Sequence, residues 1–429
     1  MSKLTYKQAV DWLNSSQRLG MKPGLKRINS LLDHLGIPEK NFQSIHVGGT
    51  NGKGSVCRYL SSILMKEGYK IGLFTSPHLF NIRERFSINE IMISEKEFSL
   101  LISKLKDVVE HEDETLRPTY FEICTALMFL YFDMKKVDYA IIEVGLGGRY
   151  DATNVIKPIL SIITNVSYDH TDILGDTIEK ITFEKAGIIK DGIPLVTAAE
   201  KKALTIIKEE VIRHHTTMVH VADSKSTIIK HTPEYQLIRV KGMLDEYNLK
   251  THEIGTYQRK NLALAIAAIE QLQMMGVFIS PESITKGVEL MFHQGRMKII
   301  HTNPTIIIDG AHNSPGMKEL NASIHSLFQD KNIILVFGVL KDKDINQMIK
   351  EIYSLCQKII ITKPDNLRAA DSELVKNIAS SYFSNEQIIV THTIPDAIDQ
   401  GLKHASNDDI VLITGSLYLI SEVMDYFEK

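Results

Sequence analysis

The sequence predicts an α/β protein with two domains, each built on a mostly parallel sheet, and a small antiparallel meander attached to the first. Three observations support this fold class. Short runs rich in β-branched residues alternate with amphipathic helical stretches over the first part of the chain. The same alternation returns after residue 300, and a glycine-rich segment near residue 48 lies between an expected strand and an expected helix.

The first domain is expected to contain five strands of a mostly parallel sheet. They are residues 44–47, 71–74, 139–143, 159–164 and 194–197. Each is a short apolar run, and stretches of helical period separate them. From residue 219 to residue 254 the runs become short and alternating, as in residues 235–240, which predicts an antiparallel meander.

The second domain is expected to repeat the α/β design. An amphipathic helix over residues 261–275 and a helix starting near Pro281 lead into it. The second series of strands covers residues 305–308, 333–337, 358–361, 387–390 and 410–414. We place the boundary within residues 293–298, which gives domains of residues 1–295 and 296–429. A chain of 429 residues is long enough for at least two domains.

Composition and charge exclude several classes of protein. A formal net charge of −3 argues against nucleic-acid binding, which requires an excess of Lys and Arg. Cys57, Cys124 and Cys356 have no metal-binding spacing and fit a reducing cytoplasm. The most apolar run, residues 123–132, is too short for a membrane span of about twenty residues, and the N-terminus lacks the apolar region of a secretory signal. We therefore expect a cytoplasmic protein without nucleic-acid or membrane partners.

A glycine-rich loop follows the first expected strand and precedes a helix expected from Val56. Glycines let backbone N–H groups converge on phosphate oxygens, the helix N-terminus adds positive partial charge, and Lys53 can bridge terminal phosphates. The loop therefore predicts an ATP site, with a simple glycine turn as the alternative. Because Gly54 separates Lys53 from Ser55, the spacing differs from G-x-x-x-x-G-K-[ST] and does not by itself place that hydroxyl on magnesium. The residues expected to bind ATP here are Gly49, Thr50, Asn51, Gly52, Lys53, Gly54 and Ser55.

Polar side chains follow three of the expected parallel strands. Glu143 ends one strand, Ser76 follows a second and His170 follows a third. The carboxyl ends of parallel strands share one edge of the sheet, so we expect these side chains to converge near the phosphate loop. Mg²⁺ prefers oxygen ligands, which suits Glu143, whereas a lone histidine is more often structural than a ligand. His170 is a metal candidate only because of its neighbours.

Eight segments resemble those of one enzyme family in their order and spacing. They are HVGGTNGKGS, TSPHL, TYFEICTALMF, EVGLGGRYDATN, SYDHTDILG, FEKAGIIK, HQGRMKII and DGAHNSPGMKEL. Together they resemble the folylpolyglutamate and dihydrofolate synthases of the Mur ligase superfamily and extend over nearly the whole chain. The resemblance implies a phosphate-loop NTPase-like N-terminal domain, residues 1–295, and a Rossmann-like C-terminal glutamate ligase domain, residues 296–429.

The resemblance implies an ATP-dependent ligase that adds L-glutamate to the γ-carboxylate of (tetrahydro)folate polyglutamates. Mg·ATP phosphorylates the carboxylate, the amine of glutamate attacks the acyl phosphate, and phosphate leaves without a covalent enzyme intermediate. Lys53, magnesium and the helix dipole would neutralise the two anions that are brought together. Activity on dihydropteroate is left open, and the resemblance favours a monomer.

The resemblance also implies two magnesium ions and a modified lysine. Ser76 and Glu143 resemble ligands of one ion, and Glu143 and His170 resemble ligands of the second. Lys185 resembles the lysine that is carbamylated in the family and, with Lys53, is expected to be catalytic. Carbamylation requires a neutral amine and hence a lowered pKa. The alternative for Lys185 is an unmodified lysine on a helix surface.

Further residues resemble nucleotide, glutamate and folate contacts. Asn261, Arg296 and Asp309 resemble nucleotide contacts, and His312 resembles a residue on the glutamate side and is expected to be catalytic. Asn261 also suits a helix cap, and Arg296, in the expected linker, could reach a phosphate on domain closure. The segments that resemble the folate site are the mobile loop 22–25 and the walls 119–122 and 148–151. The individual residues expected to contact the folate are Lys22, Pro23, Thr119, Tyr120, Phe121, Gly148, Arg149, Tyr150 and Asp151.

Several alternatives remain open. Phe121 belongs to a stripe of helical spacing, and such stripes are more often core than ligand contacts. Dihydrofolate synthesis is an alternative main activity. A cell-wall amino-acid ligase acting on a UDP-sugar peptide is a rival within the superfamily, against which the TSPHL and GLGGRYDATN segments argue. An ATP-dependent switch or binding module is a rival from another class, and it would not need Glu143, His170 and Lys185.

Overall fold

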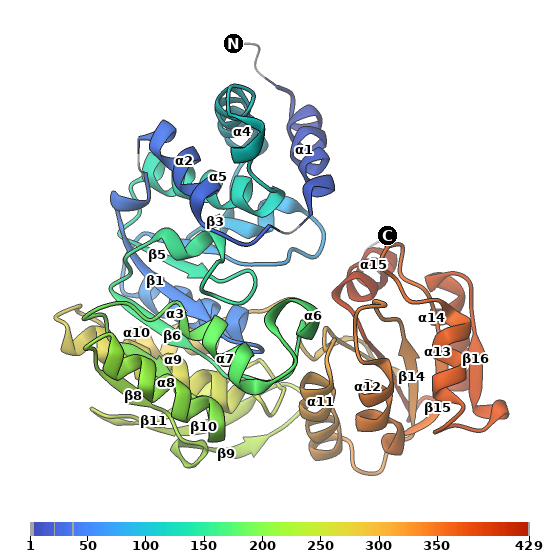
Figure 1. The fold of residues 1–429 in the computed structure, drawn as a ribbon. Helices are drawn as coiled ribbons and strands as arrows, with labels where there is room; N and C mark the ends of the chain where they lie inside the picture. The colour runs from blue at the N-terminus through green and yellow to red at the C-terminus, as the bar shows by residue number, and fades with distance from the viewer. Residues whose placement is uncertain (1–3, 21, 37, 428–429) are drawn as a thin grey trace. The chain divides into compact units, whose positions relative to one another are not determined.

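The structure is a computed structural model that describes residues 4–20, 22–36 and 38–427. The chain forms two compact units, which can be followed by colour in Figure 1. The first unit contains the chain up to residue 225 with residues 240–246 and 260–290, and the second contains residues 226–239, 247–259 and the chain from residue 291. Each unit has a mostly parallel sheet with helices packed on it, so the predicted α/β fold class is confirmed.

An eight-stranded sheet of order β4-β3-β2-β5-β1-β6-β7-β8 forms the centre of the first unit. Its strands are β1 (Gln43–Gly48), β2 (Ile71–Phe74), β3 (Phe86–Ile88), β4 (Ile91–Met92), β5 (Tyr139–Glu143), β6 (Leu160–Ile163), β7 (Leu195–Thr197) and β8 (Met218–His220). Strands β2, β5, β1, β6, β7 and β8 pair in parallel, whereas β3 and β4 form an antiparallel edge. In the register of β1 with its neighbours, Val47 lies opposite Glu143 and Gly48 opposite Ile163. The ends of β1, β5 and β6 therefore meet at one edge of the sheet.

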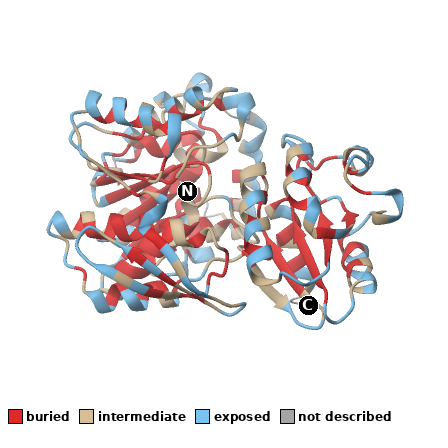
Figure 2. Cartoon of the chain, turned by 90° about the horizontal axis from the view of Figure 1, so that it is seen from below, coloured by how far each residue is buried: buried red, intermediate tan, exposed pale blue. Residues whose placement is uncertain are grey.

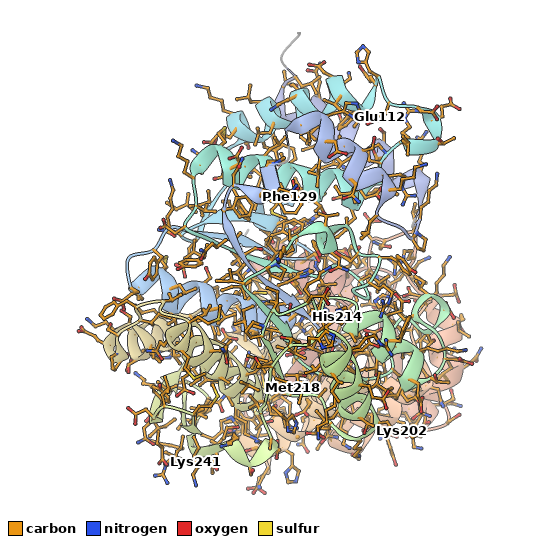
Figure 3. The ribbon with its side chains drawn as sticks, turned by 60° about the vertical axis from the view of Figure 1, so that its left-hand side comes forward. Glu112, Phe129, Lys202, His214, Met218 and Lys241 are labelled. Carbon is orange, nitrogen blue, oxygen red and sulfur yellow. The ribbon has the colours of Figure 1, made fainter. Side chains whose placement is uncertain are left out.

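Ten helices of the chain lie in or enter the first unit within its described residues. They are α1 (Tyr6–Ser15), α2 (Lys26–Leu35), α3 (Lys53–Lys66), α4 (Glu95–Val109), α5 (Tyr120–Lys135), α6 (Thr171–Leu174), α7 (Ile178–Ala186), α8 (Lys201–Arg213), α9 (Gln258–Met274) and α10 (Pro281–Leu290). Figure 1 shows α4 and α5 on one side of β1 and β5, and α3 with α10 on the other. In Figure 3, Lys202 labels the first turn of α8, His214 the residue after its end, and Met218 the first residue of β8.

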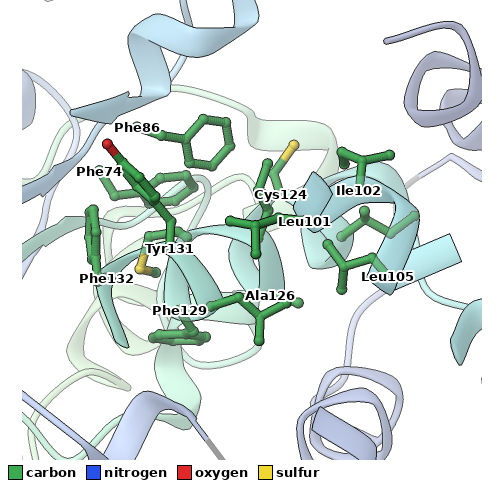
Figure 4. Close-up of a cluster of buried hydrophobic side chains, with 14 of the residues drawn as sticks. Phe74, Phe86, Leu101, Ile102, Leu105, Cys124, Ala126, Phe129, Tyr131 and Phe132 are labelled. Carbon is green, nitrogen blue, oxygen red and sulfur yellow. The ribbon is translucent and has the colours of Figure 1, made fainter. Parts of the chain in front are cut away.

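Aromatic side chains fill the space between the sheet and helices α4 and α5 (Figure 4). Phe74 and Phe86 come from β2 and β3 with ring centroids 5.5 Å apart, and Phe129 and Phe132 come from α5. The alternating burial of apolar residues on α4, such as Leu101 and Leu105, follows its helical period. This packed layer holds the start of α5, where the predicted folate wall begins, on a rigid base.

A six-stranded sheet of order β12-β13-β17-β14-β15-β16 forms the centre of the second unit. Its strands are β12 (Lys298–His301), β13 (Thr305–Asp309), β14 (Ile333–Phe337), β15 (Cys356–Ile361), β16 (Ile388–Val390) and β17 (Ile410–Thr414), and its helices are α11 (Ser314–Leu327), α12 (Ile345–Ile352), α13 (Ser372–Ala379), α14 (Ile394–His404) and α15 (Leu417–Phe427). In this sheet β12 pairs antiparallel with β13, and the other described strands pair in parallel. All five strands predicted for this domain are present. In both units the strands are mostly buried and the outward faces of the helices exposed (Figure 2).

The predicted meander is a three-stranded sheet of order β11-β10-β9. Its strands are β9 (Ser226–His231), β10 (Gln236–Lys241) and β11 (Glu246–Thr251). The start of the predicted region was wrong, because β8 pairs in parallel with β7 and extends the large sheet instead. No helix among the described residues is both long and apolar enough to cross a membrane.

Candidate active site

The phosphate loop, residues 48–55, connects β1 to α3. Helix α3 begins at Lys53, earlier than the expected start at Val56, so Lys53 lies in its first turn. Gly49 and Gly52 have φ angles of +133° and +84°, which residues with side chains rarely adopt. The first N–H groups of α3 lie at the end of this turn, as a helix N-terminal anion site requires. The predicted strand, glycine loop and helix are thus all present.

Two residues after β6 hold this loop in place, and neither was predicted as functional from the sequence. The N–H of Asn51 donates to Oδ1 of Asn165 at 3.0 Å. The Asn51 carbonyl accepts from Nδ2 of Asn165 at 2.9 Å and from Oγ1 of Thr164 at 2.7 Å. The N–H of Thr50 donates to the Asn165 carbonyl at 2.9 Å. The only signal in the sequence was a Thr-Asn pair at the end of a strand, which gives no indication of its partner.

Lys53 and Lys185 both reach the carbonyl oxygen of Gly49. Nζ of Lys53 donates to this carbonyl at 3.2 Å and to that of Thr50 at 3.1 Å. Nζ of Lys185, from α7, donates to the Gly49 carbonyl at 2.9 Å. The residue is 4% exposed, so the alternative of a surface lysine is wrong. Burial and then the Lys53 ammonium lower the pKa of Lys185 to about 7, against an opposing effect of Asp169.

Glu143 lies at the end of β5 and is 4% exposed. Its Oε2 accepts a hydrogen bond of 3.0 Å from the backbone N–H of Ser76. The structure therefore brings together two of the predicted metal-binding residues, next to the strand that leads into the phosphate loop. The charge of Glu143 also raises the pKa of the Cys57 thiol in α3, although burial has the larger effect.

His170 precedes helix α6 and has a φ angle of +49°, in the left-handed region. Its backbone N–H donates to Oδ1 of Asp169 at 3.0 Å, and its Nε2 lies 3.9 Å from the same oxygen. Asp169, which was not predicted as a site residue, thus acts on both His170 and Lys185. In the described part of the chain, no three His, Cys, Asp or Glu residues form a group that could hold an ion.

The loop after Glu143 is held by its own Asp151. The Asp151 carboxylate accepts from the N–H of Leu146 at 2.8 Å, and from the N–H and the hydroxyl of Thr153 at 3.0 and 2.6 Å. Burial raises the pKa of Asp151, and these hydrogen bonds oppose the shift. Oδ1 and Oδ2 of Asp151 therefore both fix the loop, a role that was not predicted from the sequence. The contact of Asp151 with the folate stays a prediction.

The other predicted members of this wall have different surroundings. The guanidinium of Arg149 lies over the ring of Phe183, 3.8 Å from its centroid, and donates to the Phe183 carbonyl at 3.1 Å. A Cβ on Gly148 would lie 2.8 Å from the Lys185 carbonyl, so only glycine fits without a shift. Tyr150 is 53% exposed. Arg149 and Tyr150 thus present aromatic and cationic surface beside a tightly packed turn.

The start of α5 and the loop at Lys22 are joined by an ion pair. Arg27 Nε donates to Glu122 at 3.1 Å, and its NH2 lies 3.0 Å from the other carboxylate oxygen. Arg27 also donates to the carbonyl of Lys22, and Glu122 accepts from the N–H of Thr119 at 2.6 Å. Arg27, which was not predicted, therefore connects two predicted folate-binding segments through Glu122, the last residue of the predicted wall 119–122.

Phe121 contributes to the core as well as to the predicted folate wall. It is half-buried and packs on the aromatic cluster, with its ring centroid 6.0 Å from that of Phe74. A Cβ on Gly145 would lie 2.4 Å from the Phe121 ring, so the ring lies directly against the loop after Glu143. Both roles expected from the sequence, core and wall, are compatible with this position.

Asn261 lies beside the phosphate loop. Helix α9 begins at Gln258, so Asn261 is inside its first turn and the alternative of a helix cap is wrong. A Cβ on Gly52 would lie 2.3 Å from Oδ1 of Asn261, which is 8% exposed. The resemblance placed Asn261 at the nucleotide, and the structure places its amide against the loop that is expected to hold the phosphates.

In the second unit, Asp309 ends β13 and is surrounded by donors. It accepts from the hydroxyl of Tyr257 at 3.0 Å, the N–H of Met297 at 2.9 Å and the N–H of Ala311 at 2.8 Å. Burial raises the pKa of Asp309, and the charge of Arg296 opposes the shift. Arg296 and Asp309 are therefore electrostatic neighbours, and Tyr257 is an additional partner that was not predicted.

His312 lies just after β13 in the same unit. Its Nδ1 is 2.9 Å from the carbonyl of Gly310, which accepts from that nitrogen. This contact fixes the tautomer with the proton on Nδ1 and leaves Nε2 as the basic atom of the neutral ring. The segment continues into α11, whose first turn is capped by the Asn313 side chain. His312 is therefore held at the carboxyl end of a strand, where ligands of parallel sheets bind.

Two family models match the chain. The Mur ligase middle domain matches residues 47–269, and the Mur ligase glutamate ligase domain matches residues 295–417. The chain is 40% identical over 428 residues to the dihydrofolate synthase/folylpolyglutamate synthase of Bacillus subtilis, covering 97% of this chain and 98% of that protein. It is 31% identical over 438 residues to the folylpolyglutamate synthase of Lacticaseibacillus casei, covering 98% of both.

Solved structures give the same result. Mycobacterium tuberculosis folylpolyglutamate synthase complexed with ADP is 28% identical, with a TM-score of 0.92 over 99% of this chain and 98% of that one. Escherichia coli FolC in complex with DHPP and ADP is 27% identical, with a TM-score of 0.87 over 98% and 97%. Together with the phosphate loop and the two parallel sheets, these matches define a ligase of the Mur superfamily. Within it, the chain belongs to the folylpolyglutamate synthase/dihydrofolate synthase family.

Proposed function

We propose that the protein is an ATP-dependent ligase that joins the amine of L-glutamate to the γ-carboxylate of a (tetrahydro)folate or of its polyglutamates. The observation that carries this proposal is the position of Lys53 and Lys185 at one carbonyl of the phosphate loop, with Glu143 at the end of the strand next to β1, in a chain of this family. A switch that only binds ATP would not need a buried lysine there. ATP is the expected nucleotide because both solved relatives named above contain ADP.

The chemistry brings two anions together and then replaces phosphate by an amine. The γ-phosphoryl group of ATP moves to the carboxylate oxygen and gives an acyl phosphate and ADP. The neutral amine of glutamate attacks the acyl carbon, loses a proton, and the C–O bond to phosphate breaks, which gives the amide. Lys53 and the N-terminus of α3 would stabilise the phosphoryl group in transit, where such preorganised charges are worth the most.

Mg²⁺ fits the residues at this edge of the sheet. Mg²⁺ is usually held by one or two carboxylates together with substrate phosphates and water, and not by a complete protein cage. The buried carboxylate of Glu143, which lies beside Ser76, supports an oxygen site of this kind. We propose Ser76 and Glu143 for one ion and Glu143 with His170 for a second. When bound, the ions would supply positive charge to the phosphates of ATP.

Carbamylation of Lys185 is part of the same proposal. The reaction joins CO₂ to the neutral amine with loss of one proton, and a pKa of about 7 leaves much of the amine neutral near neutral pH. Carbamylation would therefore replace the buried ammonium of Lys185, which lies close to Lys53, by a negatively charged group. Magnesium ions nearby would favour that anion, so the modified lysine and the proposed ions support each other.

We assign the remaining site residues by class. For the nucleotide we propose the residues of the phosphate loop, Gly49 to Ser55, with Asn261, Arg296 and Asp309, and for glutamate His312. For the folate we propose the walls that contain Lys22, Pro23, Thr119, Tyr120, Phe121, Gly148, Arg149, Tyr150 and Asp151.

We further propose that residues 1–295 bind ATP and folate and that residues 296–429 bind glutamate. We propose that the protein acts as a monomer in the cytoplasm. The free cysteines Cys57, Cys124 and Cys356 support a reducing compartment of this kind.

Dihydropteroate is the second substrate that a specific observation favours. The Bacillus subtilis relative carries the names of both synthases, whereas the Lacticaseibacillus casei relative is named for folylpolyglutamate synthesis alone. The greater identity to the first favours a protein that accepts dihydropteroate as well. Glutamate addition to dihydropteroate and to tetrahydrofolate, measured side by side, separates the two cases.

Phosphate release tests the main proposal. We expect release with Mg·ATP only when both L-glutamate and a folate are present, together with an amide product of matching amount. ATP hydrolysis that proceeds without either substrate would identify a switch instead. Release with a UDP-sugar peptide but not with a folate would identify a cell-wall ligase.

A further inference from the structure

His46 is a buried histidine inside β1, two residues before the phosphate loop begins. It is 0% exposed, and its Nε2 lies 2.8 Å from Oγ1 of Thr153. Oγ1 of Thr153 in turn lies 2.6 Å from Oδ1 of Asp151. The three side chains form a chain of hydrogen bonds from the central strand of the sheet to the loop that begins at Gly145.

The proton positions along this chain follow from its end. The Asp151 carboxylate accepts from the backbone N–H groups of Leu146 and Thr153, so it acts as an acceptor and the hydroxyl of Thr153 donates to it. The Thr153 oxygen must then accept from His46, which puts the His46 proton on Nε2. Burial and, to a lesser extent, Lys190 lower the pKa of His46 to about 3, so the ring stays neutral.

The other ring nitrogen of His46, Nδ1, is also buried. Among the described residues, Nδ1 is buried without a hydrogen-bond partner. A buried polar atom left in this way has a cost that an apolar residue in β1 would not have. We therefore attribute the presence of a histidine here to the hydrogen bond that its Nε2 makes with Thr153, and not to a gain in stability.

We propose that His46 is a positioning residue that, through Thr153, orients Asp151 and with it the folate-facing turn 145–151. This inference rests on the proposed function. Asp151 is held from both sides, by the backbone of its own loop and by Thr153. Without the bond from His46, the Thr153 hydroxyl can rotate away and the turn that carries Gly148 and Arg149 loses one of its restraints. The nucleotide side of the site, at Gly49, is held separately by Asn165 and Thr164.

The test uses two pairs of variants of the full chain. His46→Gln keeps a donor near the position of Nε2, and His46→Leu removes it. Thr153→Ser keeps the hydroxyl, and Thr153→Val removes it at nearly constant volume. For the Leu and Val variants we expect a roughly tenfold higher KM for the folate, with kcat and the KM for ATP changed less than twofold, since the loss of one hydrogen bond corresponds to about this factor. The Gln and Ser variants should stay within about threefold of the wild type.

Nitrogen-15 NMR of histidine-labelled protein provides a second readout. It reports which ring nitrogen of His46 carries the proton, and a residue that only fills space in the core would not need that particular tautomer. We expect one buried ring with a protonated Nε2 and a bare Nδ1 from pH 5.5 to pH 8, and its signal should shift in Thr153→Val. An unchanged folate KM in folded Thr153→Val, or a ring with the proton on Nδ1, would overturn the proposal. Failure of the proposed function is separate, because it is seen in the wild type as phosphate release that ignores folate and glutamate.

Discussion

Lys185 Nζ and Lys53 Nζ donate to the same backbone oxygen, that of Gly49, at 2.9 and 3.2 Å. Two ammonium groups in this arrangement repel each other, and one of them is buried. The burial and the repulsion both lower the pKa of Lys185 to about 7. The site therefore contains, beside Lys53, one buried amine that can be neutral at physiological pH, that of Lys185.

Lys185→Met should stabilise the protein at low pH in bicarbonate-free buffer. The folded-state pKa of about 7 is below the ordinary value of 10.5, so between these values the unfolded chain binds the extra proton and wild-type stability rises with pH. The cost of the buried ammonium is fully present below pH 7 and corresponds to about 5 kcal/mol at most. We therefore expect the free energy of unfolding of the variant, measured with urea, to exceed that of the wild type at pH 6. The difference should shrink as the pH rises from 7 to 10.

Exposed Lys66 on α3 provides the control for this comparison. Lys66→Met should change the free energy of unfolding by less than about 0.5 kcal/mol at pH 6, where the effect of Lys185→Met is expected to be largest. A stability difference for Lys185→Met that is flat between pH 6 and pH 10 would show that the lysine keeps its ordinary pKa.

Lys53→Ala should abolish ligation and leave the fold intact. The Lys53 ammonium donates to two loop carbonyls and the residue is partly exposed, so it adds little to the core. The loss of a charge that stabilises the transferring phosphoryl group should lower kcat by about 10²-fold or more. Lys66→Ala on the same helix is the matched control and should keep wild-type turnover. Near-normal phosphate release by folded Lys53→Ala would refute the assignment of the phosphate loop.

The sheets and the residues at their edges could be predicted because their signals are local. Apolar runs of four to six residues, such as residues 71–74, correspond to strands whose faces are both covered. A glycine loop between a strand and a helix is typical of a phosphate site, and Glu143 is the last residue of its strand in sequence and structure alike. Parallel pairing then brings such strand ends together without further information.

Pairings between distant segments could not be predicted in the same way. Asn165 holds Asn51, and Arg27 joins Glu122, through side chains separated by many residues in sequence, and polar residues of these types occur throughout the surface. The burial of Lys185 was also not evident, because its helix α7 has a mixed pattern of apolar and charged residues. Short strands such as β3 and β4 have too few residues for a periodic signal.

Glu143→Gln should abolish activity at ordinary Mg²⁺ concentrations. The substitution keeps the shape of the side chain and the acceptor for the Ser76 N–H, but it removes the charge proposed to hold the ion. We expect kcat/KM to fall by at least about 10²-fold, with partial recovery at high Mg²⁺ because weaker binding can be offset by concentration. A magnesium titration of phosphate release measures both effects. Exposed Glu90→Gln is the control, and wild-type activity of Glu143→Gln at low Mg²⁺ would exclude it as a ligand.

Asn165→Ala should weaken ATP binding more than folate binding. The Asn165 amide pairs with both backbone groups of Asn51. Its loss leaves the loop held from this side by the Thr164 hydroxyl and by the Asn165 backbone carbonyl, which accepts from the N–H of Thr50. We expect the KM for ATP to rise at least roughly tenfold and the KM for folate to change less than twofold, since two hydrogen bonds are lost on the nucleotide side. This is the reverse of the pattern expected for Thr153→Val. Equal effects on both substrates would indicate general unfolding of the site instead.

Lys185 should carry a carbamate in the active enzyme. Its amine lies at the Gly49 carbonyl next to Lys53, and conversion to an anion would replace repulsion by attraction. With ¹³C-bicarbonate, Mg²⁺ and a nucleotide present, we expect one carbamate signal that is absent from Lys185→Ala. Its occupancy should increase with bicarbonate and as the pH rises through about 7, where the amine becomes neutral. Lys185→Ala should lose most activity, and a short carboxylic acid should restore part of it by occupying the vacated space. Full activity of an enzyme that shows no such signal would rule out the modification.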